Sequence, residues 1–354
     1  MAKVVHAEAL KAFGKRVFQA FGVPENDALM LSDSLVMAEL WGHSSHGMLR
    51  LPWYVNRLRQ GAMSPEDVSI TVTDAGSLVV IDANHSMGQV MAMKAIGMGM
   101  ARAKQHGISA VAVRNSNHFG TAAYFTRQVA ESGFISLFVT NASPAMAPWG
   151  GSQKLIGTNP WSIAAPAGKR GVVVMDIANT AVARGKIYLA AERNETIPDF
   201  WATDAHGVPT TLAGEAVHGL LLPMAGHKGY AIAFMMDILA GVLTGSQFGK
   251  DVAGPYDATQ KSGCGHLLIT IDIAGMITND EFNNRINKLI DQVKAVPATQ
   301  GVAEIFFPGE IENRQAAENV KHGIILADNT WQGLARLAEE AAVALPAAIP
   351  TLAQ

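Results

Sequence analysis

Two short apolar segments, Ile108–Val113 and Phe134–Thr140, constrain most strongly what this chain can fold into. Short apolar runs bounded by turn residues are typical of buried β-strands. Each run follows a stretch with helical periodicity, at residues 88–106 and at residues 121–132. Because strands that alternate with helices build layered α/β domains, this order predicts an α/β fold.

The same two periodicities predict the other elements. Helices are expected at residues 7–21, 28–40, 53–61, from Arg184 onward, and at 230–245, 280–296, 310–321 and 328–343, and strands at 77–81, 171–177, 266–273 and 302–307. Residues 141–166 are rich in Pro, Gly and Asn, and residues 194–225 are irregular. A Pro-, Gly- and Asn-rich stretch such as 141–166 usually serves a ligand or a subunit contact, whereas residues 194–225 are expected to run over the surface. The Ala- and Pro-rich tail is expected to fray.

Composition excludes several classes of protein. The chain has 354 residues, 49% of them hydrophobic and 16% charged, with a net charge of −3, which suits a globular oligomer and gives no basic surface for nucleic acid. The most apolar segment, Tyr230–Leu243, is too short to cross a membrane. A single cysteine, Cys264, fits a reducing compartment, and the first residues show no apolar leader. We therefore expect a cytoplasmic protein with no membrane partner.

The stretch from Ser45 to Arg50 carries the densest chemistry in the sequence, a hydroxyl, an imidazole and a guanidinium. If the segment is helical from His46, then His46 and Arg50 are four residues apart and share a face. Histidine can move a proton near neutral pH, and arginine can hold a carboxylate with two parallel hydrogen bonds. The alternative is a polar helix start, with Ser45 as its N-cap. The segment alone does not decide between the two.

Several common enzyme motifs are missing from the sequence. A dinucleotide fingerprint needs Gly-x-Gly-x-x-Gly between a strand and a helix, whereas Gly97 and Gly99 lie within a predicted helix. There is no Walker loop, no His-Glu-x-x-His and no Gly-x-Ser-x-Gly motif. Cys264 and His266 alone make a poor zinc site, so no metal is predicted.

Seven segments, taken in order, resemble one family. They are Ser45-His46-Gly47-x-x-Arg50, Asn117-His118-Phe119-Gly120, Pro148-Trp149-Gly150-Gly151, Gly157-Thr158-Asn159-Pro160, Asp176-Ile177-Ala178, Ile197-Pro198-Asp199-Phe200-Trp201-Ala202 and Lys228-Gly229-Tyr230. The chain resembles the type-2 malate/L-lactate dehydrogenase family from about residue 6 to residue 340. This family also includes sulfolactate dehydrogenases, ureidoglycolate dehydrogenases and cyclic-imine reductases.

The resemblance implies a nicotinamide-dependent oxidoreductase that forms a homodimer or a larger oligomer. It also implies a non-Rossmann fold of α/β class with α+β character, in which a mostly antiparallel or mixed central sheet accompanies a helical domain. On this basis residues 1–115, joined by 310–354, are expected to form the helical, dimerisation and substrate domain. Residues 116–309 are expected to form the cofactor-binding domain. The cofactor is NAD or NADP, and the sequence does not choose between them.

The resemblance also assigns substrate-handling roles. It makes His46 the acid/base residue with Ser45 as its orienter, and Arg50 the clamp on the substrate carboxylate. Thr158 and Arg184 are further expected substrate contacts. In the ureidoglycolate branch the histidine that matches His118 is the base, so the choice between the two histidines stays open. A turn residue that bonds its own loop is a further alternative for His118.

Cofactor contacts are implied for a larger set of residues. These are His118, Phe119, Gly120, Thr121, Ala122, Asn141, Asp176, Ile177, Ala178, His227, Lys228, Pro308, Gly309 and Glu310. The backbone N–H groups at the start of the helix near Thr121 suit a pyrophosphate. Lys228 either pairs with a phosphate or is a surface lysine at a helix start.

The resulting prediction is hydride transfer between NAD(P) and a small 2-hydroxy acid or 2-oxo acid, malate- or lactate-like. The alternative is a ureidoglycolate dehydrogenase or a cyclic-imine reductase. In the imine-reductase branch an acidic residue follows two positions after the one matching Arg184, and Lys186 stands there in this chain. The sequence therefore leans toward the hydroxyacid branch. A non-catalytic oligomeric binding protein is a remote third hypothesis. The identity of the acid stays open.

Overall fold

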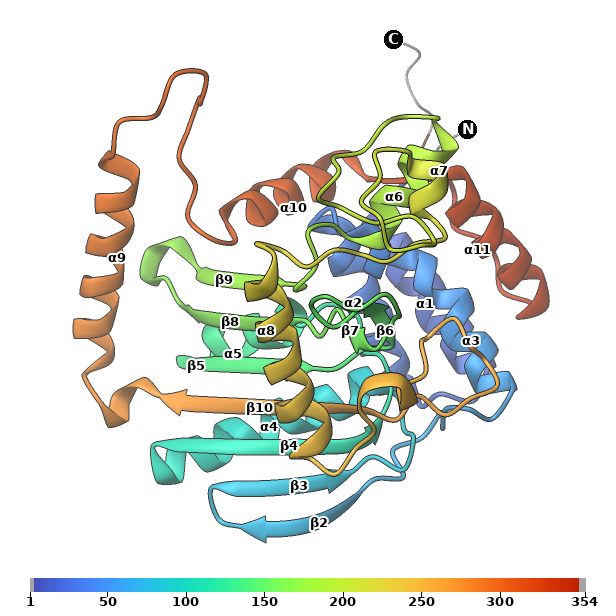
Figure 1. The fold of residues 1–354 in the computed structure, drawn as a ribbon. Helices are drawn as coiled ribbons and strands as arrows, with labels where there is room; N and C mark the ends of the chain where they lie inside the picture. The colour runs from blue at the N-terminus through green and yellow to red at the C-terminus, as the bar shows by residue number, and fades with distance from the viewer. Residues whose placement is uncertain (1–2, 350–354) are drawn as a thin grey trace.

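A mixed β-sheet forms the centre of the computed structural model, which describes residues 3–349 (Figure 1). Within these residues seven strands pair in the order β2-β3-β4-β10-β5-β8-β9. Their bounds are β2 (Ile70–Ala75), β3 (Leu78–Asp82), β4 (Ile108–Ser116), β5 (Phe134–Thr140), β8 (Trp161–Pro166), β9 (Val172–Ile177) and β10 (Cys264–Asp272). Only the β3–β4 pair in this sheet is parallel. The predicted α/β class with a mostly antiparallel, non-Rossmann sheet is confirmed.

Helices lie on both faces of this sheet and around it. They are α1 (Ala7–Ala20), α2 (Glu25–Leu40), α3 (Leu51–Arg59), α4 (Gly88–His106), α5 (Ala123–Glu131), α6 (Arg184–Glu192), α7 (Ala213–Ala216), α8 (His227–Asp237), α9 (Asn279–Ala295), α10 (Glu310–His322) and α11 (Asp328–Glu340). Helices α4 and α5 pack on one face, and α8 with the π-helical turn η4 (Ile238–Val242) packs on the other (Figure 1). Two short ladders, β1 (Lys3–Val5) with β11 (Ile324–Leu326) and β6 (Pro144–Met146) with β7 (Ile156–Gly157), complete the fold. The largest apolar core lies between α1, α2, α4, α5 and the sheet.

Elements with a strong periodicity form where the sequence predicts them. The helix predicted at residues 88–106 and the strand predicted at residues 134–140 coincide with α4 and β5. Strand β8 lies in the Pro- and Gly-rich stretch that was expected to be loop, and β2 also escaped prediction. The stretch Ile70-Thr71-Val72-Thr73 does alternate apolar and polar residues as a strand does, although all six residues of β2 are exposed in the structure.

The strand predicted at residues 302–307 is wrong, because this segment is irregular. A single backbone bond, from Val174 N–H to the Pro308 carbonyl, joins the end of this stretch to the edge of the sheet. Val302 and Phe306 are instead substantially exposed. An apolar segment therefore forms a β-strand only where another strand lies beside it to pair with.

The predicted division at residues 115 and 116 stays a prediction. Strands β2, β3 and β4 come from before that point, and they share one sheet with four later strands. Residues 350–354 of the proposed C-terminal segment, with the end of the tail expected to fray, lie outside the described residues. In the described part of the chain no helix is long and apolar enough to cross a membrane.

The sheet face under η4 offers a test of close packing. Gly265 in β10 lies so near the Ala240 carbonyl that a Cβ atom there would overlap it, whereas a Cβ atom on exposed Gly97 in α4 would meet nothing. Gly265→Ala should lower the free energy of unfolding by roughly 2 to 4 kcal/mol. Gly97→Ala, the matched control, should leave it equal or raise it by up to about 1 kcal/mol. Urea denaturation of both variants measures the difference, and equal stabilities would contradict this packing.

Candidate active site

The segment that links α2 to α3 holds the first half of the site. Two short 3₁₀ turns, η1 (Ser44–His46) and η2 (Met48–Arg50), follow one another and lead into α3. They are interrupted at Gly47, whose φ of −90° and ψ of −142° are not helical. The α-helical spacing predicted for His46 and Arg50 is therefore wrong. Both residues nevertheless stay within one compact turn of chain.

Hydrogen bonds within this segment fix its two functional side chains. The hydroxyl of Ser45 lies 2.9 Å from Nδ1 of His46. Arg50 donates from Nε to the carbonyl of Ser45 at 2.6 Å, and its guanidinium lies over Trp53 at 4.2 Å from the ring centroid. Within residues 3–349 no protein acceptor binds Nη1 or Nη2 of Arg50. These two groups are the pair that a carboxylate would engage.

The second half of the site is His118, which lies in the turn between β4 and α5. Its ring stacks against that of His46, with centroids 5.8 Å apart and planes at 22°. Nδ1 of His118 lies 2.6 Å from the hydroxyl of Tyr54 and accepts a hydrogen bond from Gly120 N–H at 3.3 Å. The structure thus brings together the two histidines between which the sequence did not choose as the proton-transfer residue.

Both imidazoles are uncharged at neutral pH. Burial, and after it the charge of Arg50, lowers the pKa of His46 to about 3. The same causes hold the pKa of His118 well below its usual value. A carboxylate bound by Arg50 would offset the positive charge that depresses both pKa values. The site is therefore suited to a small anion that arrives beside a neutral base.

Two further predicted substrate contacts lie on neighbouring segments. Arg184 is the first residue of α6, and the next residue, Gly185, approaches the Cβ atom of Ser45 at 3.9 Å, measured from an ideal Cβ position. Arg184 itself donates a hydrogen bond to the Val217 carbonyl at 3.5 Å. The Thr158 carbonyl accepts hydrogen bonds from Asn179. The start of α6 therefore borders the site, and contact of Thr158 or Arg184 with substrate stays a prediction.

Phe119, Thr121 and Ala122, which follow His118, are buried, and they differ in whether their side chains have partners within the protein. Phe119 is 2% exposed and stacks on Phe138 with centroids 5.0 Å apart, so its side chain belongs to the core. Ala122 is also buried. Thr121 is buried too, and its hydroxyl has no hydrogen-bond partner in the described chain. An unpaired buried hydroxyl is costly, which makes Thr121 the residue here that most fits a ligand contact.

Asp176 occupies the N-terminus of α5. Its carboxylate accepts a hydrogen bond from Ala123 N–H at 2.7 Å. Burial raises its pKa to about 6, and the backbone hydrogen bonds partly offset that rise. The anion at this helix start is thus the protein's own carboxylate, which would repel a phosphate. The half-buried Ile177 is the last residue of the edge strand β9, and the half-buried Ala178 follows it.

Asn141 lies in an internal network at the end of β5. Its side-chain amide donates to Asp237 and to the Gln247 carbonyl, and its oxygen accepts from Gly265 N–H at 2.9 Å. The residue is 2% exposed. Both amide protons are therefore used within the protein, where they join β5, α8 and β10. The implied cofactor contact of Asn141 stays a prediction.

The start of α8 presents a free cation. His227 and Lys228 are exposed, and Lys228 has no ion-pair partner among residues 3–349. The helix start is held in place at Gly229, where a Cβ atom would overlap the Met224 carbonyl and lie 2.8 Å from that of Asn179. Trp149 contacts the His227 ring edge-on at 6.0 Å. Lys228 and the N–H groups of this first turn can together receive an anion.

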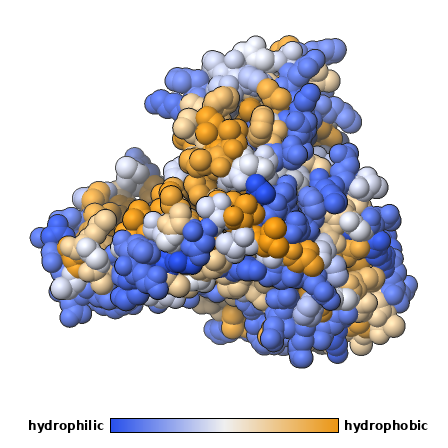
Figure 2. Space-filling view, turned by 90° about the horizontal axis from the view of Figure 1, so that it is seen from below, coloured by the Kyte–Doolittle hydropathy of each residue, from blue (hydrophilic) through white to orange (hydrophobic). Residues whose placement is uncertain are grey.

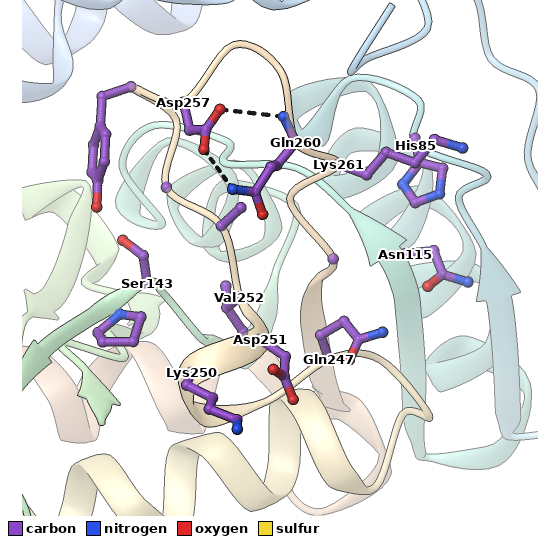
Figure 3. Close-up of a pocket in the computed structure, with 15 residues that line it drawn as sticks. His85, Asn115, Ser143, Gln247, Lys250, Asp251, Val252, Asp257, Gln260 and Lys261 are labelled. Carbon is purple, nitrogen blue, oxygen red and sulfur yellow. Dashed lines mark hydrogen bonds between the residues drawn. The ribbon is translucent and has the colours of Figure 1, made fainter. Parts of the chain in front are cut away.

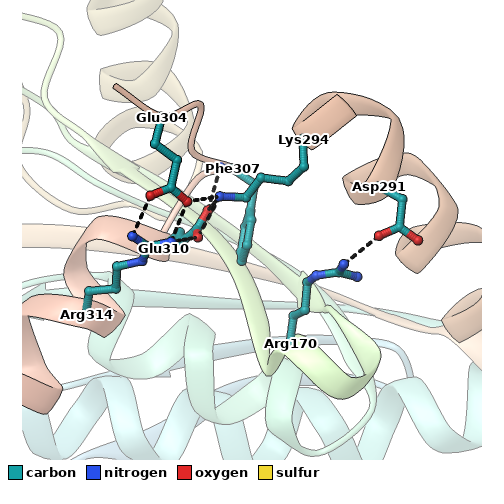
Figure 4. Close-up of polar contacts among 7 residues, drawn as sticks. All are labelled: Arg170, Asp291, Lys294, Glu304, Phe307, Glu310 and Arg314. Atoms are coloured by element: carbon teal, nitrogen blue, oxygen red, sulfur yellow. Dashed lines mark hydrogen bonds and ion pairs between the residues drawn. The ribbon is translucent and has the colours of Figure 1, made fainter. Parts of the chain in front are cut away.

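The segment Pro308-Gly309-Glu310 is fixed by an ion-pair cluster (Figure 4). The Glu310 carboxylate is bound by Lys294 and Arg314, and it also accepts from Phe307 N–H at 3.2 Å. Glu304 bridges the same two cations. The Glu310 carboxylate is therefore used within the protein, where it holds the start of α10 in place. The predicted cofactor contact of Pro308, Gly309 and Glu310 stays a prediction, and the backbone of this segment is the part left to make it.

Sequence reasoning missed the polar face of α3. Tyr54 and Arg57 lie three residues apart on one side of α3, and the predicted Arg50, at the N-cap of this helix, lies four residues before Tyr54. Arg57 is 1% exposed and donates to Asn117 at 3.0 Å and to the carbonyls of Gly254 and Asp257. The same spacing was the signal that could have revealed them.

The loop that Arg57 holds, residues 254–257, forms part of the lining of a cavity of about 770 Å³. It is polar, and its lining includes His85, Asn115, Lys250, Asp251 and Lys261 (Figure 3). In the described chain no group of three or more His, Cys, Asp or Glu side chains is placed to bind a metal.

Glu39 lies beneath the turn that carries His46. Its carboxylate accepts a hydrogen bond from Met48 N–H at 2.8 Å, and Gly47 packs so closely on it that a Cβ atom would overlap. The side chain is buried, and its Oε2 has no hydrogen-bond partner in the described chain. Burial raises the pKa of Glu39 to about 7, although hydrogen bonds from Ser44 and Met48 oppose the rise.

The chain is an α/β oxidoreductase whose mixed sheet differs from the doubly wound dinucleotide-binding fold. A family model described as malate/L-lactate dehydrogenase matches residues 5–335, and the chain belongs to that family.

Three known proteins show the extent of the similarity. The malate/(S)-sulfolactate dehydrogenase of Methanothermus fervidus is 35% identical over 95% of this chain and 98% of its own length. The ureidoglycolate dehydrogenase (NAD(+)) of Escherichia coli K12 is 32% identical over 88% of this chain and 89% of its own. The solved sulfolactate dehydrogenase of Methanocaldococcus jannaschii superposes with a TM-score of 0.91 at 34% identity, covering 96% of this chain and 98% of that one. Each match covers both halves of the site.

Stability should depend on pH through Glu39. Because its folded pKa of about 7 lies above the ordinary 4.5, the folded state loses stability as pH rises through that interval. Glu39→Gln keeps an acceptor for Met48 and cannot ionise. Relative to the wild type, the variant should therefore gain up to about 3 kcal/mol of unfolding free energy between acid and neutral pH. Urea denaturation of both proteins across this range measures the gain, and a constant difference would contradict a buried ionising Glu39.

Proposed function

We propose that this protein transfers a hydride reversibly between NAD(P) and a small 2-hydroxy acid or its 2-oxo acid, malate- or lactate-like. The observation that carries the proposal is the position of Arg50 beside two stacked, neutral imidazoles. It gains weight from the family, whose named members include malate and sulfolactate dehydrogenases.

Arg50 would hold the substrate carboxylate. Its Nε is held by the Ser45 carbonyl and its planar face by Trp53, so the guanidinium is fixed before substrate arrives. A pre-positioned fork lowers the entropic cost of orienting the acid. The carbon next to the carboxylate, where the reaction takes place, would then lie near the histidine pair.

One of the two histidines would exchange a proton with the substrate oxygen. In the oxidation direction a neutral imidazole accepts the hydroxyl proton, which matches the lowered pKa values of both rings. In the reduction direction the ring must first be protonated. The bound carboxylate favours that protonation, because it offsets the charge of Arg50.

The residues present suit a nicotinamide dinucleotide. The unpaired hydroxyl of Thr121, three residues after His118 in the chain, offers a donor and an acceptor to the nicotinamide end. Lys228, exposed at the start of α8, offers a cation to a phosphate. Asp176 already occupies the start of α5, so α8 suits the phosphates better than α5 does. When bound, the nicotinamide supplies or receives the hydride.

A ureidoglycolate dehydrogenase is the second candidate, because one relative carries that name and His118 lies in the site. A cyclic-imine reductase is weaker on the sequence, because Lys186 replaces the acidic residue that the resemblance leads one to expect. The choice between NAD and NADP belongs to experiment.

Exposed apolar side chains support the proposal that copies of this chain associate. Phe234, Met235, Val242 and Leu243 are about half exposed or more on α8 and just beyond it. Figure 2 shows apolar surface gathered in patches between hydrophilic areas. Apolar exposure of this kind marks interaction surfaces, which supports the predicted homodimer or larger homo-oligomer. A cytoplasmic location stays a prediction.

A substrate screen tests the proposed function directly. Purified protein is mixed with NADH or NADPH and a panel of 2-oxo acids, 2-hydroxy acids with the oxidised cofactors, ureidoglycolate and cyclic imino acids. We expect nicotinamide absorbance to fall with at least one small 2-oxo acid. No turnover with any substrate and no binding of either reduced cofactor, measured by nicotinamide fluorescence, would exclude the proposal.

Arg50→Lys separates substrate binding from cofactor binding. Lysine keeps the charge but loses the planar fork, so the KM for the 2-oxo acid should rise by about tenfold or more. The affinity for NAD(P)H should change little. Arg59→Lys is the matched control, because Arg59 lies at the surface against Glu340 and should leave both constants unchanged. Equal weakening of substrate and cofactor by Arg50→Lys would count against the clamp.

A further inference from the structure

The hydrogen bonds around His118 define which of its nitrogens carries the proton. Gly120 N–H points at Nδ1, at 3.3 Å, and the Tyr54 hydroxyl lies 2.6 Å from the same atom. A backbone N–H can only donate, so Nδ1 must be an unprotonated acceptor. A neutral His118 therefore carries its proton on Nε2.

Tyr54 reinforces this tautomer. Its ring is 1% exposed, and burial raises the pKa of its phenol, so the hydroxyl keeps its proton. With Nδ1 already an acceptor, the phenol is the donor in this short contact. Nε2, on the opposite side of the ring, has no protein partner in the described chain.

His46 is not constrained in the same way. Its Nδ1 faces the Ser45 hydroxyl at 2.9 Å, and a hydroxyl can either donate or accept. When Nδ1 of His46 donates to Ser45, its Nε2 has a free lone pair. His46 can therefore become a base without breaking a backbone hydrogen bond, whereas His118 cannot.

We propose that Tyr54 and the Gly120 amide fix the tautomer of His118, so that His118 is a hydrogen-bond donor through Nε2 and the acid/base role falls to His46, as the family resemblance implies. This inference rests on the proposed function. In the oxidation direction the substrate O–H bond breaks and its proton passes to Nε2 of His46. The α C–H electron pair leaves as hydride to the oxidised nicotinamide, and the C=O bond forms. His118 donates a hydrogen bond from Nε2 to the substrate oxygen and keeps its Nε2–H bond throughout the step.

Nitrogen NMR on the histidine-labelled full chain reads the tautomer directly. The His118 signals are assigned by their loss in His118→Gln. We expect Nδ1 to resonate as an unprotonated nitrogen and Nε2 as a protonated one at neutral pH. Tyr54→Phe, which keeps the ring and removes the hydroxyl, should shift the Nδ1 signal of His118 and leave His266 unchanged. Protonated Nδ1 in the wild type would overturn the proposal.

A matched pair of glutamine variants gives the kinetic test. Glutamine keeps an N–H donor near the Nε2 position but cannot accept a proton. His118→Gln should stay within about tenfold of wild-type kcat and keep its pH profile, and His118→Ala should lose more. His46→Gln should lose about 10²-fold or more and lose the pH-dependent limb. An equal loss in His118→Gln, together with a lost pH limb, would make His118 the base.

These outcomes separate the inference from the proposed function. A wild type that turns over no 2-oxo or 2-hydroxy acid refutes the function, while the NMR tautomer can still be read. An active wild type with protonated Nδ1 on His118 refutes the inference and leaves the function intact. Thermal unfolding of each variant identifies any loss of activity that comes from misfolding.

Discussion

The buried hydrogen bond between Arg57 and Asn117, two residues 60 positions apart in the chain, joins the two halves of the site. Arg57 lies on α3, whose preceding turns carry His46 and Arg50, and Asn117 directly precedes His118. The same guanidinium also holds the Gly254–Asp257 loop at the wall of the polar cavity. A buried cation kept by several acceptors fixes orientation strongly, because losing one acceptor leaves charge unsatisfied.

The electrostatic character of the site follows from the same arrangement. Arg50 and Arg57 lie near rings that are largely shielded from solvent, and both positive charge and desolvation favour neutral imidazole. Under the proposed function, an anion bound by Arg50 would offset this charge and favour protonation of an imidazole, which would couple substrate binding to proton transfer.

The sequence predicted the parts of the fold that depend on local periodicity. Helix α4 and strand β5 have strong patterns, whereas β2 is exposed throughout and β8 lies in a Gly- and Pro-rich stretch. Whether a strand forms depends on its neighbours, which explains the wrong prediction at residues 302–307. The pairing of His46 with His118 came from the resemblance, because local spacing says nothing about residues this far apart.

Polar residues were harder to interpret than apolar ones. Asn141 and Glu310 use their side chains within the protein, and a sequence does not show which polar groups are already satisfied. Tyr54 and Arg57 lie in a stretch that was interpreted only as an apolar helix. The sequence does not show that these two polar side chains are buried and hydrogen-bonded. Their structural role can be recognised only when their buried partners are known.

Isotope transfer tests the central claim most directly. The protein is supplied with NADH or NADPH deuterated at nicotinamide C4 and with a 2-oxo acid that it turns over, and the product is examined by mass spectrometry and NMR. The account predicts that one deuterium appears on C2 of the hydroxy acid, from one face of the nicotinamide only. A product whose C2 hydrogen comes from water, or that carries no deuterium, would contradict hydride transfer at this site.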